Sequence, residues 1–401
     1  MLKRTFKAFE SRDFRLLWAG ACTSSIGTWM QTLAQSWLVL EISGNPFYLG
    51  LDSFLGQIPI FLLSLVGGVV ADRMDRRHLL VASQVIQMAC ATLLATLFLV
   101  GVVEVWHILS LSFVVGVAQA FGGPAYQALI PTLVKSEDLP NAIAMNSVQF
   151  NLARILGPVL GGLALTQLGA AWCFYLNGIS YMAPIIALLI VRSHFRPKPD
   201  QGSMLDSMKQ GIAFIRGRAG MEALIVLAFL MTMLGLPLIV FLPVFARDIF
   251  QRGPSGYTLF LVTSGVGSIT GALLVATFHH GRRKGLIALV NLVLLGIAIV
   301  GFSQSRMLPL SCAILFLGSA ALIMVFTLIG SLVQEITADE MRGRVMSVYN
   351  VAFRGGMPFG SLISGKFVRD FGAPAVLAVN GVLLSLLGVS FLIARKKVRQ
   401  L

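Results

Sequence analysis

Two arginines stand inside long apolar stretches of this sequence, where charged side chains are rare. Arg154 and Arg354 each lie roughly 15–20 Å along a predicted helix from its start, at about 1.5 Å per residue. A guanidinium ion in apolar surroundings needs water, an anion or a hydrogen-bond acceptor as its partner. The two arginines therefore predict either an anion-binding or coupling site, or a structural pair with a carbonyl or carboxylate group.

One carboxylate, Asp52, falls about a turn inside an apolar stretch, and Glu41 falls at the end of the preceding stretch. Burial disfavours the charged form of a carboxylate and raises its pKa, so that proton uptake and release become possible near neutral pH. We therefore expect Asp52 to be the candidate proton-coupling group. The alternative is an exposed side chain in the hairpin that joins the two stretches.

Amide and hydroxyl side chains recur at helical spacing within the apolar stretches. The set consists of Gln31 and Gln35, four residues apart, Gln119 and Tyr126, seven apart, and Asn151, on the helix face of the first arginine. Polar groups in a lipid environment are costly unless they face protein or water. These residues are therefore expected either to line a binding cavity or to hold neighbouring helices together.

The composition predicts where such helices lie. Hydrophobic residues make up 56% of the chain and charged residues 12%, against roughly 25% charged residues in soluble domains. A water-soluble protein of 401 residues cannot bury that much apolar surface, and a membrane span needs about 20 mostly apolar residues. We predict an all-α membrane protein with twelve transmembrane helices in two six-helix bundles.

The basic residues predict the orientation of these helices. Of the 31 Lys and Arg residues, 24 fall in the terminal segments and in alternate connections, and 5 fall in the remaining connections. Basic residues are enriched on the cytoplasmic side of membrane proteins, so we expect both termini in the cytoplasm. Because this pattern explains the net charge of +14, no nucleic-acid partner is expected.

One long polar connection divides the chain. It covers 193–221, and its second part has helical periodicity, which predicts a helix on the membrane surface. The predicted domains are a six-helix bundle at 1–192, this cytoplasmic linker, and a second six-helix bundle at 222–401.

The two predicted bundles are related in sequence. At an offset of 200 residues, Arg154 and Pro158 recur as Arg354 and Pro358, in the fifth predicted span of each half. Two parallel repeats of this kind typically flank a site near the middle of the membrane.

A polar loop after the second predicted span has the spacing GxxxDRxxRR. It contains Gly68, Asp72, Arg73, Arg76 and Arg77. The glycine permits close helix packing, and the aspartate can pair with an arginine or interact with the N-terminus of a helix. The loop predicts a latch on the cytoplasmic side that opens and closes, or else a basic loop that sets the topology.

This loop looks like the signature of the major facilitator superfamily, usually GxxxDRxGRR. The departure is Asp75, which stands where glycine is usual. That variant resembles the branch that contains enterobactin exporters and macrolide-efflux permeases. The resemblance extends through the six-plus-six layout to nearly the whole chain.

A second motif, in the fifth span, is similar to the GPxxGG motif of antiporters in this superfamily. It consists of Gly157, Pro158, Gly161 and Gly162. Small residues allow tight helix contact and proline allows a bend. The motif resembles exporters more than importers, and generic helix packing is the alternative interpretation.

The resemblance implies a proton-coupled exporter of a bulky amphipathic or anionic compound, such as a siderophore, a macrolide or another drug. It further implies two halves that rock, a monomer in a bacterial cytoplasmic (inner) membrane, and no cofactor beyond the proton gradient. The alternatives are an importer or uniporter of the same fold, and a non-transporting membrane scaffold. No nucleotide loop, metal cluster or nucleophile–base pair is present in the sequence, so no enzyme and no metal site is expected.

Overall fold

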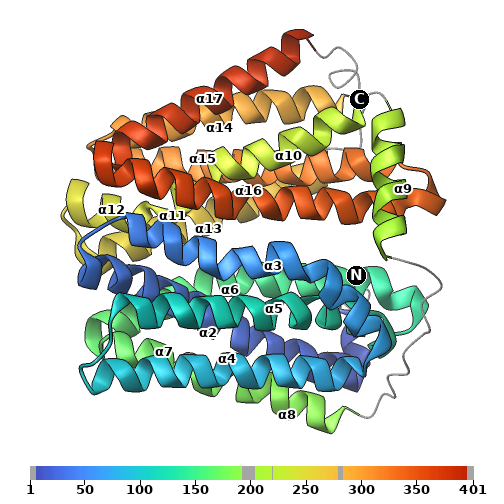
Figure 1. Cartoon of the computed structure of the whole chain (residues 1–401), viewed down its shortest axis with the longest axis horizontal. Coiled ribbons are helices and arrows are strands. Elements are labelled where there is room, and N and C mark those ends of the chain that lie inside the picture. Colours follow the sequence, from blue (N-terminus) through green and yellow to red (C-terminus); the bar gives the residue numbers. More distant parts are fainter. Residues whose placement is uncertain (1–5, 192–203, 219, 279–282, 395–401) are drawn as a thin grey trace. The chain divides into compact units, whose positions relative to one another are not determined.

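The computed structural model describes residues 6–191, 204–218, 220–278 and 283–394. Regular structure within these ranges is helical throughout (Figure 1). The basic positions 192–198, 282 and 395–399, and part of the predicted linker, lie outside the described residues.

The first part of the chain forms long helices joined by short turns. Its elements are η1 (Lys7–Glu10), α2 (Arg12–Ser43), α3 (Phe47–Arg73), α4 (Arg76–Leu99), α5 (Val105–Leu133), η2 (Ser136–Asp138), α6 (Leu139–Gln167), α7 (Ala170–Ser180) and α8 (Met182–Ile190). The second part repeats this pattern. Its elements are α9 (Met204–Gly217), α10 (Met221–Gly235), α11 (Pro237–Val240), α12 (Leu242–Val244), the π-helical turn η3 (Phe245–Ile249), α13 (Gly253–Phe278), α14 (Lys284–Gln304), α15 (Leu308–Ile336), η4 (Asp339–Met341), α16 (Arg342–Phe371) and α17 (Ala373–Ala394).

Proline breaks two of the predicted spans. The sixth span is interrupted at Tyr181, between α7 and α8. Pro184 explains this break, because its ring displaces the carbonyl group of residue 180 and it has no N–H to donate. The seventh span is divided into α10, α11, α12 and η3, with Pro237 and Pro243 at the starts of α11 and α12.

Ten helical segments among the described residues are long and apolar enough to cross a membrane. α2 and α16 are not among them, although they contain 32 and 30 residues. Both carry many polar side chains, including the polar stripe of α2 and Arg354 of α16. The ten segments show a multi-span helical membrane protein.

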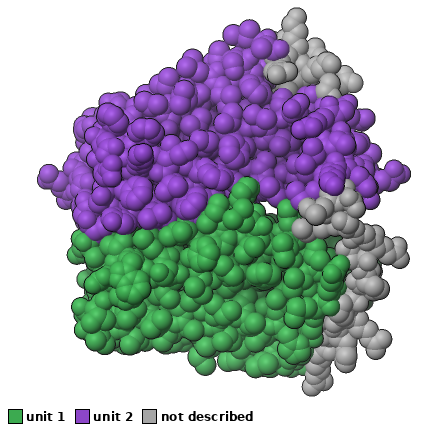
Figure 2. All heavy atoms as spheres, in the orientation of Figure 1, with its two compact units in different colours: residues 1–42, 55–201 green, residues 43–54, 202–401 purple. Residues whose placement is uncertain are grey.

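The helices gather into two compact units (Figure 2). Unit 1 comprises residues 1–42 and 55–201, and unit 2 comprises residues 43–54 and 202–401. α3 therefore contributes its first part to unit 2 and the rest to unit 1. Buried apolar side chains form the core of unit 1 near its η1 end, among them Phe14, Leu17 and Leu129.

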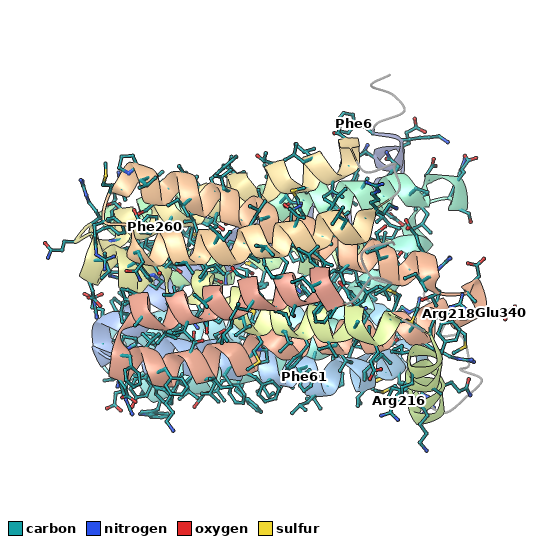
Figure 3. The ribbon with its side chains drawn as sticks, turned by 90° about the horizontal axis from the view of Figure 1, so that it is seen from above. Phe6, Phe61, Arg216, Arg218, Phe260 and Glu340 are labelled. Atoms are coloured by element: carbon teal, nitrogen blue, oxygen red, sulfur yellow. The ribbon has the colours of Figure 1, made fainter. Side chains whose placement is uncertain are left out.

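Within unit 2, α9 lies across the ends of the longer helices (Figure 1). A side chain added to Gly211 would stand 2.9 Å from the Arg344 carbonyl oxygen, so glycine allows α9 to lie close against α16. Arg216, Arg218 and Glu340 lie together at this end, and Phe260 lies toward the other (Figure 3).

Candidate functional site

The loop between α3 and α4 is tied down inside unit 1. Arg76 donates from Nη2 to Asp72 Oδ1 at 3.1 Å, from Nε to the Ala71 carbonyl at 3.2 Å and from Nη1 to the Ala128 carbonyl of α5 at 3.0 Å. Asp75 accepts from the Arg77 backbone N–H at 2.8 Å and caps the first turn of α4. The aspartate that departs from the superfamily pattern thus has a structural role.

Two other arginines of the loop differ in their contacts. Arg77 donates to the Leu189 carbonyl at 2.8 Å and to the Val191 carbonyl at 3.5 Å, at the end of α8. Arg73 is exposed and forms no ion pair with another described residue. The loop therefore braces α3, α4, α5 and α8 against one another, and its role as a latch stays a prediction.

Gly68 makes no close helix contact within unit 1, and its role in the proposed latch stays a prediction. A side chain added there would meet no atom within 4 Å, whereas one added to Gly67 would overlap the Ala120 carbonyl group. Successive residues point about 100° apart around a helix, so only Gly67 faces α5. Within unit 1, the close approach of α3 to α5 is therefore at Gly67, the residue before the glycine of the motif.

The polar stripe of α2 forms part of a hydrogen-bonded chain. Asn177 Nδ2 donates to Gln31 Oε1 at 2.6 Å. Gln31 Nε2 donates to Gln35 Oε1 at 3.2 Å, and Gln35 Nε2 donates to Ser112 Oγ at 2.9 Å. Within α7, Ser180 Oγ also lies 3.2 Å from Asn177 Oδ1, to which it donates.

A second branch joins α4, α5 and the break in the sixth span. Gln87 Oε1 accepts from Gln119 Nε2 and from the Tyr181 hydroxyl, both at 3.3 Å. The Tyr181 hydroxyl also lies 3.1 Å from Thr28 Oγ1 on α2. We refer to these side chains as the amide network, which consists of Thr28, Gln31, Gln35, Gln87, Ser112, Gln119, Asn177 and Tyr181.

Two predicted site residues lie apart from this network. Tyr126 donates to Asn146 Oδ1 at 2.8 Å and joins α5 to α6. Asn151 donates to the Ser147 carbonyl of its own helix at 2.8 Å. The network residues Gln87, Asn177 and Tyr181 were not predicted, because their partners lie on other helices, which spacing along one helix does not reveal.

Arg154 stacks on an aromatic ring. Its guanidinium carbon lies 5.9 Å from the centroid of Trp29, and Phe150 approaches the same tryptophan edge-on at 6.2 Å. Arg154 is half-buried, and it forms no ion pair with another described residue. Neither carbonyl nor carboxylate is its partner there, and a cation–π contact takes their place.

Arg354 and Asp52 both belong to unit 2. Arg354 is exposed on α16, and no ion pair joins it to a described residue. Asp52 is half-buried in the part of α3 that packs on α16, where the neighbouring Ser53 donates to Ser361 Oγ at 3.1 Å. Asp52 therefore lies on α3 beside α16 and is only partly exposed, and its role in proton coupling stays a prediction.

The glycine motif of α6 lies against α2. A side chain added to Gly157 would overlap Trp29, and one added to Gly161 would stand 3.0 Å from the Met30 Cα atom. Pro158 and Gly162 are buried beside them. The motif allows close helix contact in unit 1, and its role in transport stays a prediction.

Unit 2 repeats this contact between α16 and α10. A side chain added to Gly356 would overlap Thr232 and stand 2.8 Å from the Met233 nitrogen, and one added to Gly157 stands 3.2 Å from the Met30 nitrogen. Met233 therefore matches Met30, and the rest of α10 matches α2 in the same register. This glycine match is one residue short of the offset of 200, so it places Phe353, not Arg354, at the position equivalent to Arg154.

The Asn-Gly pairs of α7 and α17 give a second match. Asn177 and Asn380 are both buried. Gly178 lies close to α4 in unit 1, and Gly381 lies close to α14 in unit 2. The backbone atoms nearest to the added side chains belong to Met88 and Thr92 in unit 1 and to Gly296 and Val300 in unit 2. With these matches the network positions Thr28, Gln31, Gln35, Gln87 and Tyr181 correspond to Met231, Leu234, Leu238, Leu295 and Leu384.

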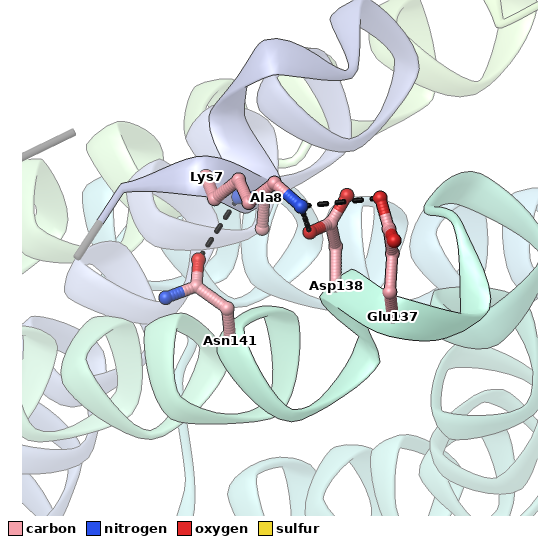
Figure 4. A network of polar contacts seen from close by, with 5 residues as sticks. All are labelled: Lys7, Ala8, Glu137, Asp138 and Asn141. Carbon is pink, nitrogen blue, oxygen red and sulfur yellow. Dashed lines mark hydrogen bonds and ion pairs between the residues drawn. The ribbon is translucent and has the colours of Figure 1, made fainter. Parts of the chain in front are cut away.

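A separate polar cluster fastens η1 to the start of α6 (Figure 4). Lys7 Nζ lies 2.9 Å from Asp138 Oδ1 and 3.1 Å from Glu137 Oε1, and the Ala8 N–H donates to Asn141 Oδ1 at 2.9 Å. Its hydrogen bonds to Asp138 and then Glu137 raise the pKa of Lys7 above its ordinary value of 10.5.

The sequence profile of a family described as "Transmembrane secretion effector" matches residues 3–401. Macrolide efflux protein A of Streptococcus pyogenes is 24% identical over 384 residues, which cover 92% of this chain and 93% of that protein. The Staphyloferrin A transporter of Staphylococcus aureus is 24% identical over 390 residues, with 93% and 94% covered. An enterobactin exporter of Escherichia coli is 23% identical over 399 residues, with 96% and 92% covered.

Solved transporter structures share the fold. A bacterial homologue of the human lysosomal transporter Spinster, in an inward-facing and occupied conformation, aligns with a TM-score of 0.76 at 14% identity and covers 96% of this chain and 97% of its own. A nucleoside transporter aligns with a TM-score of 0.75 at 12% identity, with 95% and 98% covered.

Proposed function

Because this chain belongs to the transmembrane secretion effector family of the major facilitator superfamily, we propose that it exports a bulky amphipathic or anionic small molecule across a bacterial cytoplasmic membrane. The relatives named for macrolide efflux, staphyloferrin A and enterobactin support this substrate class. These relatives are efflux-type transporters, and this chain is a membrane transporter of the same family. The substrate, the direction and the coupling ion are our proposals.

We further propose that α2 and α16 cross the membrane together with the ten apolar segments. The chain then has twelve spans in two six-helix halves, with both termini in the cytoplasm and the basic loops beside them. Polar residues that face protein or water are tolerated in a span, and the stripe of α2 is hydrogen-bonded inside unit 1. Transport then proceeds by rocking of the halves of a monomer.

The observation that carries the substrate proposal is the pairing of two features in unit 1. One is the amide network, and the other is Arg154 stacked on Trp29 without a carboxylate partner among the described residues. An unpaired guanidinium ion in a span is costly, by at least ~2.5–3.5 kcal/mol. A transported anion with an aromatic or apolar body supplies the missing counter-charge.

The coupling proposal rests on Asp52. It is the one carboxylate in the described spans that lies further than a turn from a helix end. Protonation and deprotonation of this side chain during each cycle make the proton gradient the energy source. No other cofactor is invoked.

Transport in proteoliposomes tests the direction and the coupling together. For molecules inserted inside-out, export predicts that erythromycin or enterobactin accumulates in the lumen when the lumen is acid, and that collapsing the gradient stops accumulation. Asp52→Asn is expected to abolish gradient-driven accumulation and to keep exchange of labelled for unlabelled compound. Glu41→Gln, at an exposed helix end, is the control. Accumulation under the opposite gradient would establish an importer instead.

A further inference from the structure

Resting on the proposed function, we propose that Asn177, Gln87 and Tyr181 are positioning residues for substrate recognition. They hold the side-chain amides of Gln31 and Gln119, and these amides bind uncharged hydrogen-bonding groups of the transported molecule. Such groups are the hydroxyl, ester and amide groups that abound in macrolides and in many siderophores. The proposal adds a neutral recognition surface to the cationic one at Arg154.

The exposure of the side chains separates positioning from binding residues. Asn177, Tyr181 and Gln87 are 2%, 4% and 5% exposed, so no ligand reaches them. Gln31 and Gln119 are only half-buried. Buried amide groups are nearly always hydrogen-bonded. Here buried Asn177 donates to half-buried Gln31, and buried Gln87 accepts from half-buried Gln119.

The backbone explains how the positioning residues reach α2. Pro184 breaks the sixth span directly after Ser180 and leaves Tyr181 between α7 and α8. On α2, a side chain added to Gly27 would stand 2.6 Å from Asn177 Oδ1, so glycine leaves the room that this amide occupies.

The chemistry of the network favours uncharged ligand groups. Its members are amides and hydroxyls, which both donate and accept hydrogen bonds. Gln119 Nε2 is bound to Gln87, whereas Gln119 Oε1 has no hydrogen bond to a described residue and can accept one. A neutral group that replaces its water with such partners avoids the desolvation cost that an ion meets in a low-dielectric interior.

Unit 2 supplies a matched control. Asn380 occupies the position of Asn177, is 8% exposed, and donates to Ser364 Oγ at 3.1 Å. The unit 2 positions that match Gln31 and Gln87 hold Leu234 and Leu295. Removing the Asn380 amide costs a buried hydrogen bond without touching an amide that faces a ligand.

The test compares Asn177→Ala with Asn380→Ala in proteoliposomes that contain the full chain. Erythromycin and enterobactin are both offered, and the KM is measured for whichever one the wild type transports. One neutral hydrogen bond corresponds to roughly a 3–10-fold change. Asn177→Ala is therefore expected to raise the KM by about that factor with the maximal rate retained, and Asn380→Ala to leave the KM within about two-fold.

A double-mutant cycle shows whether Asn177 acts through Gln31. In a Gln31→Leu background, Asn177→Ala is expected to cause no further rise in KM. Gln87→Met, which removes the partner of Gln119 at nearly constant volume, gives the same test on the other branch if Asn177→Ala does not fold.

The possible failures are distinct. If the wild type moves neither compound under a proton gradient, the proposed function is overturned. If it transports one of them but Asn177→Ala and Asn380→Ala change the KM equally, or the Gln31→Leu background leaves the Asn177 effect intact, the positioning proposal alone is overturned.

Discussion

Units 1 and 2 use the same helix contacts and fill them with opposite chemistry. Glycines on α6 and α16 lie against α2 and α10 in the same way, and Asn177 and Asn380 occupy equivalent buried positions. Around Asn177 the neighbouring helices present amides and hydroxyls. At the matching places of unit 2 they present the methyl groups of leucine and methionine.

One pair of positions makes the contrast concrete. Gln87 and Tyr181 share a hydrogen bond in unit 1. Their counterparts Leu295 and Leu384 both lie beside Gly235, at 3.6 and 3.9 Å from a side chain added there. The repeat conserves the packing of three helices while it changes polar contacts into apolar ones. The side chains that we propose for substrate recognition therefore lie in unit 1, and the matching positions of unit 2 are apolar.

The largest expected effect comes from the feature that the units share. Gly157→Val and Gly356→Val both force a branched side chain into a neighbouring helix. Overpacking of this kind costs about 3 kcal/mol or more where backbone atoms cannot move. Both variants are expected to lose most of their folded yield and to melt far below the wild type in detergent.

Gly123→Ala is the control for these variants, because a side chain added there meets no atom within 4 Å. It is expected to keep or slightly raise the melting temperature, since alanine favours helix by about 1 kcal/mol over glycine. If Gly356→Val lowered the folded yield and the melting temperature but Gly157→Val did not, the two helix contacts would not be equivalent.

The next effect separates the units. Leu295→Gln buries an amide without a partner, which costs roughly 1–3 kcal/mol, so the melting temperature is expected to fall with the KM unchanged. Gln87→Leu instead leaves Gln119 and Tyr181 without their shared acceptor, and it is expected to raise the KM. Melting curves and transport kinetics for both variants check this prediction, and a higher KM for Leu295→Gln would contradict it.

The arginines of α6 and α16 are expected to differ more modestly. Arg154→Lys keeps the charge but loses the planar guanidinium group that lies over the Trp29 ring. Because cation–π contacts contribute about 0.5–2 kcal/mol, we expect a roughly 3–10-fold rise in KM for an anionic substrate. Arg354→Lys, where no such stacking exists among the described residues, is expected to change the KM less. Equal changes in KM for Arg154→Lys and Arg354→Lys would contradict a role of Arg154 in substrate recognition.

The smallest effect concerns the end of unit 1. Lys7 has a pKa raised above 10.5 by Asp138 and Glu137, so its contribution to stability is complete below pH 10.5 and is lost as the pH rises through the higher folded-state value. Lys7→Met is therefore expected to lower the melting temperature slightly and equally at pH 6.5 and pH 9. The difference from wild type is expected to shrink only above pH 10.5. If the difference in melting temperature between Lys7→Met and wild type already changed between pH 6.5 and pH 9, its pH dependence would come from a group other than Lys7.

The sequence predicts features that one helix carries by itself. The spacing of Gln31 and Gln35 gives their common face, and the apolar stretches give the helices. Partners on other helices depend on packing that periodicity does not contain. For this reason Asn177 and Gln87 were not predicted, and neither interpretation of Arg154 included its contact with Trp29.

For a related reason, the sequence does not predict which of two adjacent residues on a helix faces a neighbouring helix. Gly67 and Gly68 are equivalent in composition, yet only Gly67 faces a neighbouring helix. In the sequence, Asp75 is only a departure from the motif. In the structure it accepts a hydrogen bond from the Arg77 N–H and caps α4. These details follow from the direction of each side chain, which the fold determines.

Substrate protection of cysteines at matched positions tests most directly whether unit 1 recognises the transported molecule. Gln31→Cys and Leu234→Cys are compared after the four native cysteines are replaced by alanine. The rate of maleimide modification is measured with and without the transported compound. We expect the compound to slow modification of Gln31→Cys several-fold and to leave Leu234→Cys unchanged. Protection of Leu234→Cys alone would contradict the assignment of recognition to unit 1.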